Sequence, residues 1–300
     1  MKDKLKQNSK KILLAFVLLL MIVICFGIYY QSGITLTQFG NSSMSQMMGY
    51  AIHTVKDKNI VIDGGTKEDA PQLEKYILEH GGVVDAWILT HQHKDHIGAF
   101  TEIVNNPNIT IQKVYVSLNT LEDIEKNEPK RLEDAKMLEL ALQHSSLQGK
   151  IEEVQENQEM TFDNLNIKIL GVKHPEITTN FGNNSSIVLK AKIHQQTILF
   201  LADTGEESGA QLVQKHKKEL NTDYVQVAHH GQKGVALDFY DIVSPNAALW
   251  PTPDWLWNND PGTGYNTGEW KTIETRQYLE KLNVTKHYIE KDGTQSIYIW

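Results

Sequence analysis

The sequence has almost no cysteine: Cys25 is the only one, and it lies in an apolar stretch near the N-terminus. No intrachain disulfide can therefore form in residues 31–300. Long apolar runs are also scarce. Residues 12–30 carry no charge and would span about 28 Å as a helix, close to the thickness of a bilayer core. The chain lacks the many membrane helices of a transport channel.

Beyond residue 11, basic residues are outnumbered by acidic ones. The net charge is −8, and residues 1–11 contribute +4 through five lysines and one aspartate, so the rest carries −12. An acidic domain is a poor match for a long polyanion. We therefore expect no nucleic-acid partner.

The flanks of the apolar run predict its orientation. All five lysines of the tail precede it, and no charged residue follows until Lys56. We predict a cytoplasmic basic tail at 1–11, a single transmembrane signal-anchor helix at 12–30, and one extracellular catalytic domain at 31–300 of a cell-membrane protein. A cleaved signal peptide is the alternative, although the run is long for one and no small-x-small cleavage site follows Tyr30.

The most informative stretch is Thr90-His91-Gln92-His93-Lys94-Asp95-His96. It follows the apolar run 83–89, predicted as a buried strand, and precedes residues 96–104, predicted as a helix. In an extended segment, side chains at i and i+2 face the same side, so His91 and His93 can hold one metal ion. Asp95 and His96 can hold a second ion where the chain turns into the helix. Imidazole and carboxylate suit zinc, and we expect two ions here, with manganese or iron as the alternative metals.

The HxHxDH pattern after a hydrophobic strand resembles the metallo-β-lactamase superfamily, over residues 34–300. Asn183-Asn184-Ser185-Ser186 and His229-His230-Gly231 are similar to its branch with competence-protein outer domains and phosphorylcholine esterases. The resemblance implies an α/β fold, an αββα sandwich of two mixed β-sheets flanked by helices.

The resemblance also implies the remaining ligands. Asp203, at the end of an apolar strand, would bridge the two ions, although it could instead cap the helix that follows. One of His229 and His230 would bind the second ion, and the other would touch the bridging water or the leaving group. The sequence does not distinguish them. Many superfamily members have a histidine where Asn183 or Asn184 stands here; His174 would then complete the first site or be a plain loop residue.

Three other features carry expectations. Asp63 is either a carboxylate that supports the metal ligands or part of a helix-entry turn. Trp250, Trp255, Trp257, Trp270 and Trp300 cluster toward the C-terminus, where they would stack a ligand or pin a long loop. The charged segment 123–145 reads as a helix with a solvated face, and residues 287–290 and 296–300 as a closing hairpin.

These features predict a metal-dependent hydrolase in which water attacks the substrate directly, without a covalent intermediate. Asp95 and His230 are the predicted catalytic residues. The esterase resemblance and the tryptophan-rich segment suggest phosphoesters as substrates, carried by a small molecule or by cell-envelope material. A nuclease, a lactam or lactone hydrolase, and a non-catalytic surface binding protein are the alternatives.

Overall fold

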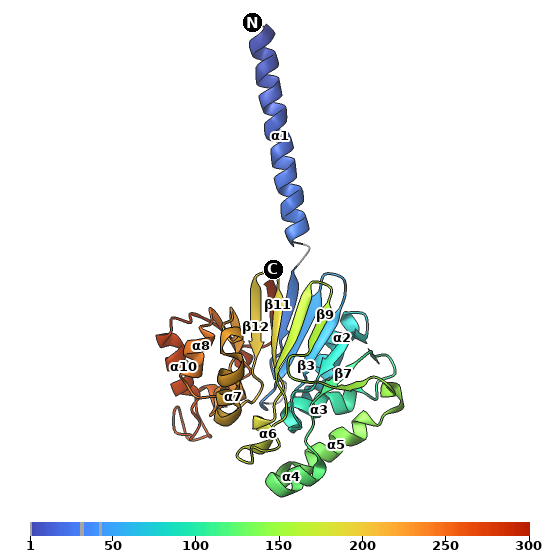
Figure 1. Ribbon diagram of the computed structural model, residues 1–300, viewed down its shortest axis with the longest axis vertical. Coiled ribbons are helices and arrows are strands. Elements are labelled where there is room, and N and C mark those ends of the chain that lie inside the picture. The colour runs from blue at the N-terminus through green and yellow to red at the C-terminus, as the bar shows by residue number, and fades with distance from the viewer. Residues whose placement is uncertain (1, 31–32, 42–43) are drawn as a thin grey trace.

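The structure is a computed structural model that describes residues 2–30, 33–41 and 44–300; in the first helix it describes the side chains of residues 8 and 10–24 (Figure 1). Two seven-stranded sheets form the body. The first sheet has the order β16 (Gln295–Ile299), β1 (Ile34–Gln38), β2 (Gly49–Thr54), β3 (Asn59–Asp63), β5 (Ala86–Ile88), β7 (Val114–Val116) and β8 (Ile151–Glu153). The second has the order β15 (Lys286–Ile289), β14 (Ala247–Trp250), β13 (Tyr224–Gln226), β12 (Gln196–Phe200), β11 (Val188–Ile193), β10 (Leu165–Gly171) and β9 (Glu159–Phe162).

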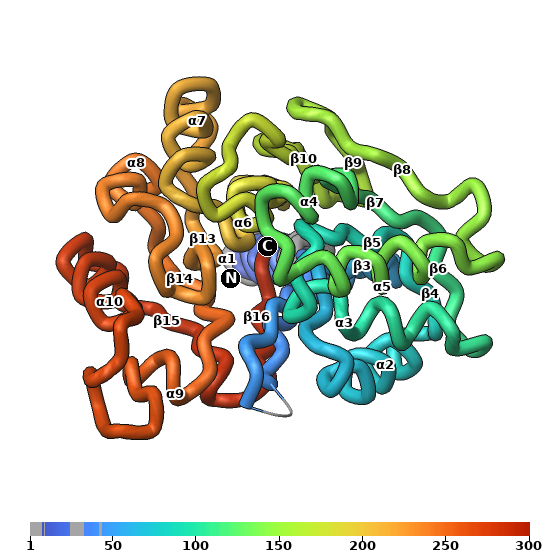
Figure 2. The backbone as a smooth tube through the Cα atoms, turned by 90° about the horizontal axis from the view of Figure 1, so that it is seen from below, coloured from blue at the N-terminus to red at the C-terminus, as the bar shows by residue number. Residues whose placement is uncertain are grey.

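Helices cover the outer faces of both sheets, as Figure 2 shows from below. Those of the first half are α2 (Ala70–Glu79), α3 (Lys94–Ile103), α4 (Leu121–Asn127) and α5 (Leu132–Leu142), with the 3-10 turns η1 (Lys67–Asp69), η2 (Pro129–Arg131) and η3 (Ser145–Leu147). Those of the second half are α6 (Phe181–Asn184), α7 (Glu206–His216), α8 (Phe239–Val243), α9 (Asp254–Trp257) and α10 (Thr272–Lys281), with η4 (Lys217–Glu219), η5 (Ala228–Gly231) and η6 (Glu290–Asp292). A small sheet pairs β4 (Val83–Val84) with β6 (Thr110–Ile111).

Three large apolar cores hold these layers together, and a small fourth one joins α4, α5 and α6. The central core lies between the two sheets and includes Ile62 and Ile88 from the first sheet and Phe200 from the second. A second core packs α2, α3 and α5 on the first sheet, and a third packs α7, α8 and α10 on the second. Burying apolar area on both faces of both sheets is the main stabilising term for such a layered fold. The predicted α/β fold, with mixed sheets and flanking helices, is confirmed.

Each sheet changes from antiparallel to parallel pairing along its width. In the first sheet β3, β5, β7 and β8 run parallel, and in the second β12, β13, β14 and β15 do. Neighbouring parallel strands end at the same edge of a sheet, where α/β proteins bind ligands. Asp63, the last residue of β3, lies at that edge, and the segments that follow β5, β12 and β13 bring residues 90–96, Asp203 and residues 228–231 to it.

The predicted closing hairpin is wrong. β15 pairs in parallel with β14 in the second sheet, whereas β16 pairs with β1 in the first. The predicted strand 83–89 is interrupted at Asp85, whose carboxylate accepts hydrogen bonds from Lys58 Nζ at 2.7 Å and the Asn59 N–H at 2.9 Å. Each difference follows from partners distant in sequence, which local patterns do not encode.

The N-terminal helix α1 (Lys2–Tyr30) projects from one end of the body, and α3, α4 and α6 lie at the other end (Figure 1). Among the residues that the structure describes, none of the helices combines the length and the apolar character that a membrane span requires. The transmembrane segment predicted at 12–30 continues through residues 25–30, whose side chains lie outside the described residues.

Candidate metal centre

The turn between β5 and α3 buries three of the predicted histidines, His91, His93 and His96, at 4% exposure or less. His93 is the N-cap of α3 and has an extended backbone, so the segment before it keeps the alternation of a strand. Two further segments reach this turn, the one after β12 with Asp203 and the one after β13 with His229 and His230. The residues therefore meet from three strand ends that lie far apart in the sequence.

The side chains form two overlapping groups. Ligand atoms of Asp95, His96, Asp203 and His230 lie within 4.8 Å of one another, as do those of His91, His93 and Asp203. Asp203 belongs to both groups, with Oδ1 3.3 Å from His96 Nε2 and Oδ2 3.9 Å from His91 Nε2. His230 Nε2 lies 3.5 Å from both Asp95 Oδ2 and Asp203 Oδ1. The side chains thus form a His/Asp cluster in which Asp203 is common to both groups, and each group would hold one metal ion.

The donor atoms fit a metal ion better than they fit one another. Two ligands that each lie about 2.1 Å from a tetrahedral zinc ion are about 3.4 Å apart, close to the observed separations. Five buried donor atoms have no hydrogen-bond partner among the described residues: His91 Nε2, His96 Nε2, His230 Nε2, Asp95 Oδ1 and Asp203 Oδ1. Unsatisfied buried polar atoms are costly, and five that gather in two adjacent groups match the needs of cations.

Hydrogen bonds on the far side of each ring select the nitrogen that faces the cluster. Asp63 Oδ2 lies 2.8 Å from His96 Nδ1, and the carbonyl of Pro251 lies 2.7 Å from His230 Nδ1. Both contacts leave Nε2 toward the cluster, as is usual for histidines that bind metals. Asp63 also accepts from the N–H and hydroxyl of Thr90, at 2.8 and 2.7 Å. The geometry therefore favours the interpretation of Asp63 as a carboxylate that supports the metal ligands.

His93 is held in the opposite sense. Its Nε2 lies 3.1 Å from Glu128 Oε2, so Nδ1 is the nitrogen left for the cluster. Glu128 sits just before η2, in a segment whose charges suggested only a solvated face. Sequence reasoning missed it, and no local signal separates it from the other glutamates of this segment.

The electrostatic field of the cluster attracts cations. Burial opposes the charged form of Asp203, but the neighbouring His96, His230 and His229 hold its pKa well below 3.8. Burial also opposes the imidazolium of His96, yet the carboxylates of Asp203 and Asp63 raise its pKa well above 6.5. Without an ion the site stabilises a proton on His96, so protons and metal ions compete for it.

The two histidines after β13 differ in surroundings. His230 is fully buried and belongs to one of the ligand groups. His229 is in neither group; its Nε2 accepts from Asn183 Nδ2 at 3.1 Å and lies 3.8 Å from Asp203 Oδ2, while its Nδ1–H donates to the carbonyl of Lys233 at 3.1 Å. Burial lowers the pKa of His229, so this ring is neutral, with Nε2 as the acceptor atom.

His174 lies outside both groups. Its Nδ1 lies 3.0 Å from Glu176 Oε1, and its N–H donates to Ser185 Oγ at 3.4 Å. Among the described residues, His174 contacts Glu176 and Ser185 and belongs to neither ligand group, so its role as a metal ligand remains a prediction.

Four residues at the strand ends that carry the site have a left-handed backbone. Asp63, Ala202, His229 and His230 all have φ between 47° and 55°, a region that is costly for residues other than glycine. Gln226 holds the turn before Asp203, because its Oε1 accepts from the N–H groups of Leu201 and Ala202 at 2.8 and 2.6 Å. Sequence reasoning missed Gln226 as well, since it reads as an ordinary strand residue.

The tryptophans divide into two roles. Trp250 is fully buried, donates from Nε1 to His287 Nδ1 at 2.9 Å, and packs edge to face on Trp257 at 5.2 Å. It therefore pins the segment after β14 to the body. Trp255 lines a cavity of about 670 Å³ that reaches Asp95.

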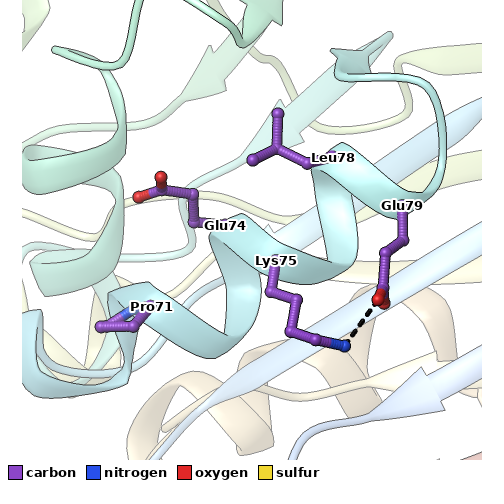
Figure 3. Close-up of a pocket in the computed structure, with 5 residues that line it drawn as sticks. All are labelled: Pro71, Glu74, Lys75, Leu78 and Glu79. Carbon is purple, nitrogen blue, oxygen red and sulfur yellow. Dashed lines mark hydrogen bonds and ion pairs between the residues drawn. The ribbon is translucent and has the colours of Figure 1, made fainter.

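A second hollow lies on the outer face of α2 (Figure 3). It is lined by Pro71, Glu74, Leu78 and the ion pair of Lys75 and Glu79, whose Nζ and Oε1 are 2.6 Å apart. No residue that lines this hollow belongs to the His/Asp cluster. Asp95, in contrast, lines the cavity that Trp255 also lines.

Comparisons with known proteins agree with this geometry. The family model described as "Metallo-beta-lactamase superfamily" matches residues 50–284. ComE operon protein 3 of Bacillus subtilis is 29% identical over 170 residues, which cover 55% of this chain and 20% of that protein. A hydroxyacylglutathione hydrolase of Aliivibrio salmonicida is 41% identical over 63 residues, 21% of this chain and 24% of that protein. The matched segments thus span a quarter or less of these relatives.

Two solved structures share the fold. The metallo-beta-lactamase fold protein YhfI of Bacillus subtilis superposes with a TM-score of 0.55 at 16% identity, covering 89% of this chain and 99% of that one. CmlA, a diiron beta-hydroxylase of Streptomyces venezuelae, superposes with a TM-score of 0.54 at 10% identity, covering 89% of this chain and 54% of that one. At these identities the likeness concerns the fold alone.

Proposed function

The chain belongs to the metallo-β-lactamase superfamily, and we propose that it is a metal-dependent hydrolase that cleaves phosphoester bonds with water as the nucleophile. The observation that carries the proposal is the sharing of Asp203 by two adjacent ligand groups. A pair of ions held side by side is suited to in-line displacement at phosphorus, where charge develops on both the attacking and the leaving oxygen.

We assign the first ion to His91, His93 and Asp203, and the second to Asp95, His96, Asp203 and His230. When bound, such ions lower the pKa of water and polarise the phosphoryl oxygen. Residues of the chain orient the ligands and limit the access of water. Asp63 and the Pro251 carbonyl hold His96 and His230 in orientation, and burial of the cluster limits access of bulk water.

His229 supplies a proton-accepting atom at the edge of the cluster. Its neutral ring keeps Nδ1–H on the Lys233 carbonyl and presents Nε2 beside Asp203 and Asn183. A neutral imidazole that is fixed in one tautomer can take up a proton at Nε2 and return it to a leaving oxygen. We therefore assign His229, rather than His230, to proton transfer, and His230 to metal binding.

A second candidate function is hydrolysis of a carbonyl ester or thioester. It is supported by the 41% identity to a hydroxyacylglutathione hydrolase, which is confined to 63 residues. The same cluster could polarise a carbonyl, as it could in the lactam and lactone alternatives.

One substrate panel separates these functions. The zinc-loaded and manganese-loaded chain is assayed with bis(p-nitrophenyl) phosphate, p-nitrophenyl phosphorylcholine, S-lactoylglutathione, a chromogenic cephalosporin and plasmid DNA. We expect the phosphodiesters to be cleaved with the highest kcat/KM. Turnover of S-lactoylglutathione or the cephalosporin alone would replace the proposal with carbonyl chemistry, and turnover of DNA alone with a nuclease. An inactive chain that still binds metal would indicate a binding protein.

We also propose that α1 anchors the chain in a cell membrane with the catalytic domain outside. The support is the row of apolar side chains from Ile12 to Ile24, whose large members are 41% to 70% exposed, and the lysines that precede them. Fractionation of cells that express the chain with and without residues 1–30 tests attachment. Degradation of the domain by protease added to intact cells tests its side, and a protected domain would refute an outside location.

A further inference from the structure

A cavity of about 670 Å³ adjoins the metal cluster on the side of Asp95. Its wall is built by η1, the first turns of α3, η2, α5 and α9, together with Ser45 and Gln46. Asp95 is part of the wall, and its side chain is 15% exposed, so a molecule in this cavity lies beside the second ligand group. The volume exceeds what one phosphoryl group needs, and it leaves room for the part of a substrate that does not react.

Three cationic side chains from three separate elements line this cavity: Lys67 on η1, Lys94 at the start of α3, and Arg131 on η2. Lys67 and Lys94 are exposed, and neither forms an ion pair with the part of the chain that the structure describes. Their ammonium groups are therefore available to a ligand.

Arg131 is partly satisfied. Its Nη1 lies 3.2 Å from Asp134 Oδ2, and its buried Nε has no partner among the described residues. A guanidinium has five N–H donors, so most of them are left over. Arg131 also belongs to the turn that begins at Glu128, the residue that contacts His93. The same turn therefore lines the cavity and contacts a residue of the metal cluster.

We propose that this cavity is a subsite for an anionic group, a phosphate or a carboxylate, on the part of the substrate that is not hydrolysed. The proposal rests on the hydrolase function proposed above and names the class of substrate: a molecule with a scissile phosphoester and a second negative charge. Lys67, Lys94 and Arg131 bind that second charge, and Asp95 marks the side on which the scissile group lies.

Glu68 and Glu102 also line the cavity and limit the size of the anion. The backbone N–H of Glu68 and the charges of Lys67 and Lys94 lower the pKa of the Glu68 carboxyl, so this carboxylate is the one with which an anion would compete for the two lysines. A long polyanion would bring further charges against both glutamates, which costs affinity. The subsite therefore favours a compact substrate with one extra charge over nucleic acid.

Three synthetic p-nitrophenyl phosphodiesters of equal length test the subsite; their second arm ends in a hydroxyl, a carboxylate or a phosphate. With the metal-loaded full-length chain we expect the KM of the charged arms to be about tenfold below that of the hydroxyl arm. The carboxylate and phosphate arms distinguish the two sources of charge. In Lys67→Gln and Arg131→Gln this ratio should fall below about twofold, and Lys67→Glu should invert it.

Lys75→Gln, on the outer face of α2, is the matched control and should keep the tenfold ratio. Arg131→Lys keeps the charge and should retain most of it. Equal KM values for all three arms in the unaltered chain, or an unchanged ratio in Lys67→Gln and Arg131→Gln, would overturn the subsite. Calorimetric binding of phosphonates with the same three arms, which cannot be hydrolysed, applies the same criteria. It tests the subsite even if no phosphodiester is cleaved and the proposed function fails.

Discussion

His93 Nε2 lies 3.1 Å from Glu128 Oε2, and the same oxygen accepts a hydrogen bond from the N–H of Gly182 at 3.0 Å. Burial opposes the charge of Glu128, but the hydrogen bond from His93 lowers its pKa below 4.5, so it stays ionised. A Cβ at Gly182 would overlap both His93 Nε2 and Glu128 Oε2. Glycine is required there for the contact to form. A residue outside the motif thus fixes one ring of the metal cluster.

Replacing Glu128 should weaken the first metal site. In Glu128→Gln the amide keeps the shape but loses the charge, and we expect zinc affinity to fall about tenfold or more. Competition with a chromogenic chelator measures the affinity. Glu125→Gln removes an exposed carboxylate from the preceding helix, α4, and should leave the affinity unchanged. Equal losses in both variants would show that the effect is general charge and not the contact with His93.

The metal turn was predictable because its information is local. The spacing of His91, His93, Asp95 and His96 and the apolar strand before them lie within a few residues of one another. Asp203 and the 229–230 pair were predicted from the family resemblance. Their spacing in the sequence does not indicate that these side chains lie near residues 91–96 in space. Their roles as ligands remain predictions, and the structure shows that the side chains meet.

The supporting residues were not predictable for the opposite reason. Glu128 contacts His93 across 35 positions, and Gln226 accepts hydrogen bonds from the N–H groups of Leu201 and Ala202, 25 and 24 positions away. Neither residue differs from its neighbours in periodicity or charge. The predicted closing hairpin was wrong for the same reason. β16 pairs with β1, more than 250 positions away, and this tertiary pairing overrides the local hairpin pattern.

The two histidines after β13 should have separable effects. His230→Ala removes a buried donor of the second group, and we expect metal content to fall by about one ion per chain. His229→Ala leaves both groups complete, so metal content should hold while kcat falls by about 100-fold. Elemental analysis of dialysed protein and steady-state kinetics give the two readouts. The reverse pattern would exchange the roles of the two residues.

Glu290 should make stability depend on pH. It is 1% exposed; Oε1 accepts from the Met47 N–H at 3.2 Å, and Oε2 has no partner among the described residues. Burial raises its pKa well above 4.5. Because the folded state holds this proton more tightly than the unfolded chain, the contribution is fully present below pH 4.5 and is lost as pH rises through the folded pKa.

Glu290→Gln should remove that dependence, since a neutral amide resembles the protonated acid. We expect it to raise the free energy of unfolding at pH 7 by about 1 kcal/mol and to change it little near pH 4. Urea unfolding from pH 4 to pH 8 measures both. Glu280→Gln, at an exposed position of α10, is the control and should leave the pH profile unaltered. A destabilised Glu290→Gln at pH 7 would mean that the carboxylate has a charged partner.

Removing metal should destabilise the fold, because the cluster then keeps five buried donor atoms without partners and two carboxylates close together. An ion present at about 100 times its Kd stabilises the folded state by about 2.7 kcal/mol, so EDTA should lower the free energy of unfolding by at least that amount. Asp203→Ala should abolish the difference between metal-loaded and EDTA-treated protein, since Asp203 serves both groups. His174→Ala should keep it, because His174 contacts Glu176 and lies outside both groups. If His174→Ala instead loses one ion and half of the stabilisation, then His174 completes the first site after a rearrangement of its loop, and His91, His93 and Asp203 do not suffice to hold that ion.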